Sequence, residues 1–196
     1  MSRSATRSRS TRETSVEITL DLDGTGTTQV DTGLPFYDHM LDQLGRHGGF
    51  DLMVKATGDL HIDSHHTVED TGILLGETFR AALGDKAGVR RFASGRYPLD
   101  EALVEVVVDL SGRPYVVWEV EMPEAIPLGN PPFDPSLAEH AIASFASAAG
   151  ITLHVELVRG RNVHHIIEAC FKGLARTLRD AVRIEGTAVP STKGVL

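Results

Sequence analysis

The segments "DSHHTVED" (residues 63–70) and "NVHHIIEA" (residues 162–169) each carry two adjacent histidines followed by a glutamate. His65 and His164 are 99 positions apart, and so are Glu69 and Glu168. The apolar patterns on either side of the two segments recur in the same order, which indicates an internal duplication. The sequence therefore predicts two similar halves that share one compact domain.

Each predicted half has the same order of elements: two strands joined by a hairpin turn, a short helix, a strand and a long helix. Alternating apolar residues indicate the strands, and apolar residues three and four positions apart indicate the helices. Asp63 or Ser64 is a suitable N-cap for the first long helix, and Asn162 opens the second. The predicted elements are residues 14–22, 27–33, 35–49, 50–58 and 64–84 in the first half, and residues 102–110, 115–122, 135–150, 151–158 and 162 onward in the second.

The limits of the two halves follow from composition and spacing. Residues 1–11 are rich in serine and arginine and have no apolar face, so we expect a disordered tail. The first half-repeat is predicted over residues 12–95 and the second over residues 96–196. The hairpin turns of the two halves are only 88 positions apart, which indicates an insertion in the second half. The Pro-rich residues 123–133 account for most of this insertion and are predicted to form a surface loop.

The composition narrows the class of protein. A formal net charge of −8 argues against a nucleic-acid-binding surface, and no apolar run is long enough to cross a bilayer. The single cysteine, Cys170, has no partner for an internal disulfide, and no signal peptide is expected at the N-terminus. We therefore expect a cytoplasmic protein with a small-molecule ligand, and no nucleic-acid or membrane partner.

The repeated histidines favour a metal site. Both short helices add an acid next to a histidine, in Asp38-His39 and Glu139-His140. Neighbouring helix residues point about 100° apart, whereas residues three or four apart share a face. The imidazoles of each pair therefore diverge, which suits two metal ions better than one. The candidate ligands, enough for two metals with three histidines and one glutamate each, are His39, His65, His66, Glu69, His140, His164, His165 and Glu168.

The ligand chemistry leaves the identity of the metal open. Nitrogen and oxygen donors without thiolate admit Mn, Fe, Co, Ni or Zn. Without a metal, burying such a cluster would cost roughly several kcal/mol per unpaired charge. An isolated histidine is usually a surface polar residue, and we interpret His61 and His154, each predicted in a strand, in that way. The residues expected in the core are Cys170, Phe79, Leu83, Leu174 and Leu178.

From about residue 12 to its C-terminus the chain resembles the imidazoleglycerol-phosphate dehydratase family of histidine biosynthesis. The resemblance rests on "TGLPFYDHMLDQLGRHGGFDL" (32–52), "GDLHIDSHHTVEDTGILLG" (58–76), "YPLDEALVEVVVDLSGRP" (97–114), "NVHHIIEACFKGLARTLRDA" (162–181) and "PSTKGVL" (190–196). It implies an α+β fold with helices sandwiched between two mostly antiparallel four-stranded sheets. It further implies Mn²⁺ as the usual metal, two ions per active site, and a homo-oligomer of about two dozen subunits (a 24-mer) built from trimers that share their active sites.

The resemblance also implies a reaction and residue roles. The family removes water from imidazole glycerol phosphate and yields imidazole acetol phosphate, through an imidazolate held between two metals. Glu13 and His47 are acid–base candidates whose separate roles stay unassigned, and Glu69 and Glu168 belong to the same catalytic centre. By resemblance, the residues that bind the substrate phosphate are Arg91, Arg113, Lys172, Ser191 and Lys193. Taken alone, any of these is better explained as a surface charge.

Two rival functions remain open at this stage. In a di-metal hydrolase the metals would activate water instead of holding a ring, but an Asp-rich ligand set would favour that chemistry over the histidine-rich set here. A non-enzymatic metal-binding cage protein would also use clustered ligands. That interpretation leaves the basic residues near the C-terminus without a role.

Overall fold

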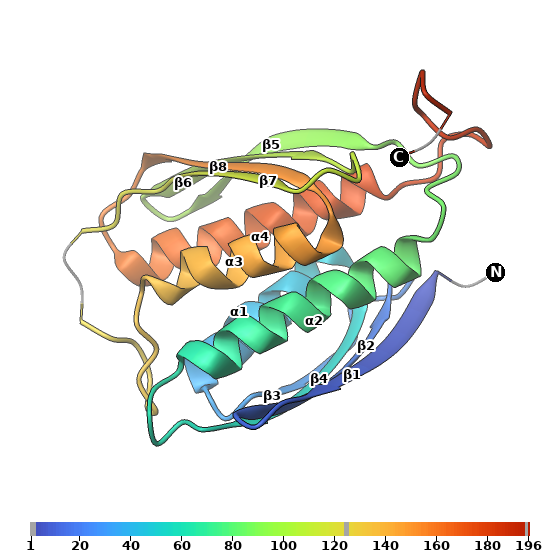
Figure 1. Ribbon diagram of the computed structural model, residues 1–196. Helices are drawn as coiled ribbons and strands as arrows, with labels where there is room; N and C mark the ends of the chain where they lie inside the picture. The colour runs from blue at the N-terminus through green and yellow to red at the C-terminus, as the bar shows by residue number, and fades with distance from the viewer. Residues whose placement is uncertain (1–2, 124–125, 195) are drawn as a thin grey trace.

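A computed structural model of the chain describes residues 3–123, 126–194 and 196. These residues form four helices packed between two four-stranded sheets, so the fold is α+β with two similar half-domains (Figure 1). The first half contains β1 (Ser4–Ser10), β2 (Thr14–Asp21), β3 (Thr28–Asp31), α1 (Pro35–Gly48), β4 (Asp51–Gly58) and α2 (His65–Leu83). The second half contains β5 (Phe92–Leu99), β6 (Ala102–Asp109), β7 (Tyr115–Glu119), α3 (Leu137–Ala149), β8 (Thr152–Arg159) and α4 (Val163–Ala181).

The strand order corrects the predicted hairpins. The sheets have the orders β1-β2-β4-β3 and β5-β6-β8-β7, with the last strand of each parallel to its neighbour and the other pairings antiparallel. The hairpins predicted from 14–22 to 27–33 and from 102–110 to 115–122 are therefore wrong. β2 instead pairs along its whole length with β4, from Thr14 opposite Gly58 to Asp21 opposite Asp51. The full-length pairing sets two long alternating apolar faces side by side, and the shorter β3 is left at the edge.

The predicted disordered tail is also corrected. Residues 4–10 form the edge strand β1, which pairs with β2 from Ser4 opposite Asp21 to Ser10 opposite Ser15. Its side chains are mostly exposed, so the backbone ladder holds a strand that has almost no apolar signal in the sequence. β1 corresponds to β5, which was not predicted, and the expected boundary between residues 95 and 96 falls inside β5. The structural repeat therefore runs from β1 to α2 and from β5 to α4.

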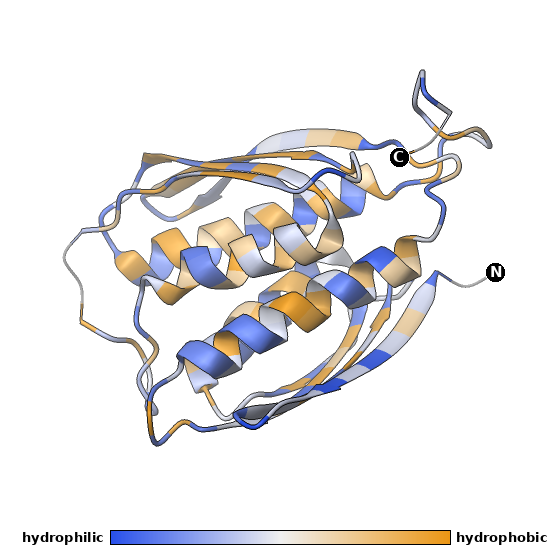
Figure 2. Ribbon diagram, viewed as in Figure 1, coloured by the Kyte–Doolittle hydropathy of each residue, from blue (hydrophilic) through white to orange (hydrophobic). Residues whose placement is uncertain are grey.

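In the core, each helix of the first half packs on a helix of the second half. α1 packs on α4, and α2 packs on α3. Gly72 and Gly76 permit the close approach of α2 and α3, since an added Cβ would lie 2.8 Å from the Ala141 carbonyl oxygen or 2.3 Å from that of Phe145. Each helix carries both apolar and polar residues (Figure 2), and all five predicted core residues are buried. Among the described residues, no helix combines the length and apolarity needed to cross a membrane.

The Pro-rich segment 123–133 is anchored more firmly than a simple surface loop; its residues 124 and 125 lie outside the described residues. Phe133 is fully buried, with its ring centroid 5.3 Å from that of Phe36 on α1. The Pro132 carbonyl oxygen accepts a hydrogen bond of 2.6 Å from Ser64 Oγ at the start of α2. Phe36 in turn packs edge-on against His164, with ring centroids 5.1 Å apart. The segment thus braces the end of the molecule that carries the paired histidines.

Candidate metal centre and substrate site

The paired histidines stand at the first turns of α2 and α4 because polar caps start both helices there. Asn162 Oδ1 accepts hydrogen bonds from the backbone N–H groups of His164 (3.0 Å) and His165 (3.4 Å). Asp63 Oδ1 accepts from the N–H of His65 at 2.7 Å. Of the two cap residues proposed for α2, Asp63 therefore provides the side-chain hydrogen bond. Both caps thus place a histidine pair at the start of its helix, where one histidine of each pair meets the neighbouring helix.

The first cluster, here called the α1–α4 cluster, consists of His39, His164 and Glu168, whose ligand atoms all lie within 4.8 Å of one another. Glu168 Oε2 lies 3.2 Å from His39 Nε2 and 3.1 Å from His164 Nε2. His39 comes from the first half of the chain, and the other two residues come from the second. Two imidazole nitrogens and one carboxylate oxygen therefore converge as a partial ligand set for a divalent transition metal.

The second cluster, here called the α2–α3 cluster, consists of His65, Glu69 and His140, which meet the same distance criterion. His140 Nε2 lies 3.3 Å from Glu69 Oε1. This Nε2 is buried and has no well-oriented hydrogen-bond partner in the described structure. A buried nitrogen without a partner is costly, and a metal ion is a chemically suitable acceptor for its lone pair. The residues therefore fit a metal site, again with ligands from both halves.

His66 and His165 lie apart from the two clusters. His66 Nδ1 is 2.9 Å from Asp59 Oδ2, and His165 Nδ1 is 2.7 Å from Glu101 Oε2. These hydrogen bonds raise the pKa of both imidazoles, and the bond from His165 lowers the pKa of Glu101 to about 2. Within one chain each cluster thus holds two histidines and one glutamate, and the third histidine of each predicted set faces elsewhere. The 100° divergence of adjacent helix residues is the physical reason.

The carboxylate partners of His66 and His165 were missed by the sequence reasoning. The predicted acid–base candidate Glu13 is exposed, with Oε1 3.9 Å from His66 Nε2. Glu101 follows Glu13 by 88 positions, the same spacing that separates β1 from β5. Glu101 is therefore the counterpart of Glu13 in the duplicated half, and the repeat itself was the signal that would have found it. Asp59 follows β4 directly and has no such sequence signal.

The surroundings of the two clusters differ in charge. Lys172 Nζ lies 2.6 Å from Glu168 Oε1. Burial alone would raise the pKa of Glu168, but Lys172 and His39 together outweigh that effect and the pKa is lowered. Burial lowers the pKa of His47 on α1, and the positive charges of Lys172 and Arg176 lower it further. The neutral imidazole of His47 is therefore favoured. The equivalent positions around the α2–α3 cluster carry the residues Ile73, Glu77 and Ala148.

The other predicted phosphate-binding residues gather at the opposite end of the helices. The backbone N–H of Arg91 donates to the carbonyl oxygen of Ala181, the last residue of α4. The Arg91 guanidinium binds both oxygens of Asp109 (2.7 and 3.1 Å) and the Pro190 carbonyl oxygen (2.8 Å). Ser191 Oγ accepts from the N–H of Lys193, whose side chain is exposed. Arg91 is thus already engaged within the chain, whereas Lys193 is open to an anion.

The exposed Arg113 belongs to this same end of the molecule, because the neighbouring Gly112 lies against the C-terminal Leu196. Both chain termini also lie at this end (Figure 1). From His164 to Ala181, α4 rises by about 1.5 Å per residue, so this group is separated from the α1–α4 cluster by roughly 25 Å. The structure therefore brings the ligands of each metal cluster together but keeps Arg91, Arg113, Ser191 and Lys193 far from them.

The sequence of the chain is similar to those of known proteins over nearly its whole length. A sequence profile of the family described as Imidazoleglycerol-phosphate dehydratase matches residues 32–178. Imidazoleglycerol-phosphate dehydratase of Acidothermus cellulolyticus is 59% identical over 99% of this chain and 93% of its own length. The enzyme of that name from Magnetococcus marinus is 55% identical over 100% of this chain and 99% of its own length.

Solved structures agree with these sequence matches. The crystal structure of imidazoleglycerol-phosphate dehydratase from Staphylococcus aureus superposes with a TM-score of 0.82 at 33% identity, over 92% of this chain and 99% of that one. The Pyrococcus furiosus protein, solved in complex with (S)-C348, gives a TM-score of 0.81 at 36% identity, over 97% of this chain and 100% of that one. The relatives therefore share both the sequence and the fold over nearly their full lengths.

Proposed function

The chain belongs to the imidazoleglycerol-phosphate dehydratase family of histidine biosynthesis and is a hydro-lyase, and we propose that it acts with two Mn²⁺ ions per active site. The substrate is imidazole glycerol phosphate, and the products are imidazole acetol phosphate and water. The observation that carries the two-metal proposal is the presence of two clusters, each with two imidazoles and one carboxylate, and each with ligands from both halves of the chain. A substrate ring with two nitrogens suits a duplicated pair of ligand sets.

The two clusters would each hold one of the two cations. His39, His164 and Glu168 would hold one cation, while the α2–α3 cluster would hold the other. When bound, divalent cations supply Lewis-acid stabilisation of the ring as its anion, which assists loss of hydroxide from the adjacent carbon. The histidine-rich ligand set favours this role over the activation of water in a di-metal hydrolase.

His47 has the protonation state expected of a base. Gln43 Oε1 lies 3.1 Å from His47 Nε2, and because a carbonyl oxygen only accepts, this assigns the proton to Nε2. Nδ1 then keeps its lone pair and is the atom able to take a proton. The exposed carboxylate of Glu13 is the second acid–base candidate of the proposed site.

The active site is proposed to be shared between subunits. One imidazole ring, a glycerol chain and a phosphate are too short to reach from the α1–α4 cluster to Lys193, since α4 separates them by roughly 25 Å. His66 and His165 belong to neither cluster of their own chain, and because Nδ1 of each is bound to a carboxylate, Nε2 is the nitrogen left for a metal. A closed homo-oligomer, for which we propose the 24 subunits implied by the family, would unite these parts.

The proposed function is tested with the purified protein loaded with Mn²⁺. Imidazole glycerol phosphate should yield an enolisable ketone, detected by ultraviolet absorbance, and elemental analysis should find about two metal ions per chain, as two ligand sets require. Release of inorganic phosphate without the ketone would point to the hydrolase. Tight metal binding without turnover of any phosphate ester would point to a metal-binding cage.

Glu101 is expected to support metal binding through His165. Replacing Glu101 by glutamine removes the charge that fixes the His165 tautomer, so Mn²⁺ affinity should fall about 10- to 100-fold. Equilibrium dialysis at defined free Mn²⁺, followed by elemental analysis, measures this change. The matched control is Glu17→Gln, which alters an exposed glutamate on β2. Equal affinity in both variants would show that Glu101 does not position a ligand.

A further inference from the structure

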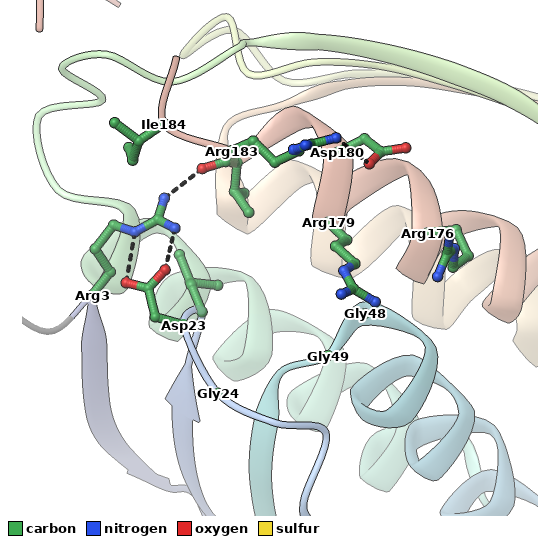
Figure 3. A pocket seen from close by; sticks show the side chains of 12 residues that line it. Arg3, Asp23, Gly24, Gly48, Gly49, Arg176, Arg179, Asp180, Arg183 and Ile184 are labelled. Atoms are coloured by element: carbon green, nitrogen blue, oxygen red, sulfur yellow. Dashed lines mark hydrogen bonds and ion pairs between the residues drawn. The ribbon is translucent and has the colours of Figure 1, made fainter. Parts of the chain in front are cut away.

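A cavity of about 630 Å³ opens where α1 and α4 end, at the opposite end of α4 from the metal clusters (Figure 3). Four guanidinium groups line it, and we call it the arginine cavity: Arg3, Arg176, Arg179 and Arg183. Its carboxylates are Asp23 and Asp180. None of these residues belongs to the metal clusters or to the C-terminal group around Lys193.

Two of the four arginines are neutralised by neighbouring carboxylates. Arg3 binds both oxygens of Asp23 (3.0 and 2.5 Å) and the Val182 carbonyl oxygen (2.5 Å). Arg183 Nη1 lies 3.7 Å from Asp180 Oδ1. These pairs are drawn as dashed lines in Figure 3. Their charges cancel, and they hold the wall of the cavity in place.

Arg176 and Arg179 carry the uncompensated charge of the cavity. Both side chains are exposed, and neither has a hydrogen bond or ion pair within the described part of the chain. The Arg179 guanidinium lies over the end of α1, because a Cβ on Gly49 would be 3.4 Å from Arg179 Cζ. The carbonyl ends of α1 and α4 offset about one of the two positive charges. The cavity stays positive and keeps unused guanidinium N–H donors.

The fold itself does not require this charge, and the duplicated half serves as the internal comparison. On α4, Lys172, Arg176 and Arg179 follow Glu168 at spacings of four, four and three residues, so they share one helix face, and Arg183 follows just after the end of the helix. The equivalent positions of α2 are Ile73, Glu77, Arg80 and Gly84. Of these basic residues α2 keeps only Arg80, the counterpart of Arg179, and it packs in the same architecture without counterparts of Lys172 and Arg176. Packing therefore does not require Arg176, and its unpaired guanidinium beside that of Arg179 is explained better by a ligand.

We propose that the arginine cavity is a second anion site of this chain, which binds a phosphate dianion. Guanidinium groups present planar N–H pairs that match phosphate oxygens, and two such groups without carboxylate partners face one cavity. The ligand is inorganic phosphate or the phosphate group of a monoester. Binding of a phosphate monoester rests on the proposed function, because the monoester would then be the substrate. The basic residues on one face of α4 would attract this substrate towards the active site.

The proposal is tested by calorimetric titration of the metal-loaded oligomer with inorganic phosphate and, separately, with glycerol 3-phosphate. We expect the double variant Arg176→Gln/Arg179→Gln to lose one class of phosphate sites, with binding there weakened about tenfold or more. Arg80→Gln is the matched control, because Arg80 is the exposed counterpart of Arg179 on α2. In the Lys193→Ala variant, we expect phosphate to bind in the arginine cavity as in the wild-type protein. Particle mass by light scattering verifies that each variant is assembled.

The outcomes separate the two sources of phosphate. Because Arg176 also acts on His47, the kinetic comparison uses the single variant Arg179→Gln, and a fall in its kcat/KM that grows at low ionic strength identifies the substrate as the anion that is captured. Unchanged kcat/KM together with the lost phosphate site identifies free phosphate. Equal phosphate binding by the double variant and the Arg80→Gln control would overturn the proposal. Because the titration needs no turnover, this result is independent of whether the proposed reaction occurs.

Discussion

Replacing His164 by alanine is expected to reduce turnover at least about 100-fold and to remove roughly half of the bound metal, because a coordination sphere loses a direct ligand. His164 Nε2 and His39 Nε2 both lie close to the same oxygen of Glu168, at 3.1 and 3.2 Å. Without His164, only one imidazole and one carboxylate remain in the α1–α4 cluster. Steady-state kinetics and elemental analysis of the dialysed protein measure the two effects.

His154→Ala is the matched control for this substitution, because His154 is an exposed histidine on β8. It should retain wild-type metal content and turnover. The equivalent change in the other cluster, His65→Ala, should behave like His164→Ala, since the two clusters correspond in the duplicated fold. Full activity with a normal metal content in both cluster variants would remove the two-metal proposal.

Co-expression of two defective variants, one in metal binding and one in substrate binding, is expected to restore activity if active sites are shared. His164→Ala damages a metal cluster, and Lys193→Ala damages the group at the other end of α4. In mixed oligomers some sites would draw an intact cluster from one chain and an intact Lys193 from another. Up to about a quarter of wild-type turnover should return when two subunit types mix at random in a closed assembly.

The measurement uses two affinity tags, one on each variant, so that only mixed oligomers are assayed. Oligomers that carry either variant alone provide the baseline. A mixed sample whose turnover equals the average of the two baselines would show that each chain carries its complete site. Such a result would contradict the separation of roughly 25 Å along α4 on which the proposal of shared sites is based.

The local pattern of the sequence determined the four helices and part of each cluster of candidate metal ligands. Spacings of three and four residues specify which side chains share a helix face, and polar residues such as Asn162 specify where a helix begins. For this reason the limits of α2, the start of α4, the grouping of His164 with Glu168 and the burial of Cys170 were all predictable. The two-fold repeat was equally visible, because it is a property of the sequence itself.

Only the tertiary structure decided which parts of the halves meet. α1 packs on α4 and not on α2, so His39 joins His164, and this choice depends on burial summed over both sheets. The edge strand β1 and the insertion of β4 between β2 and β3 depend on backbone hydrogen bonds, which carry almost no side-chain signature. Asp59 reaches His66 for the same reason: their contact is created by the packing of a strand end on a helix start.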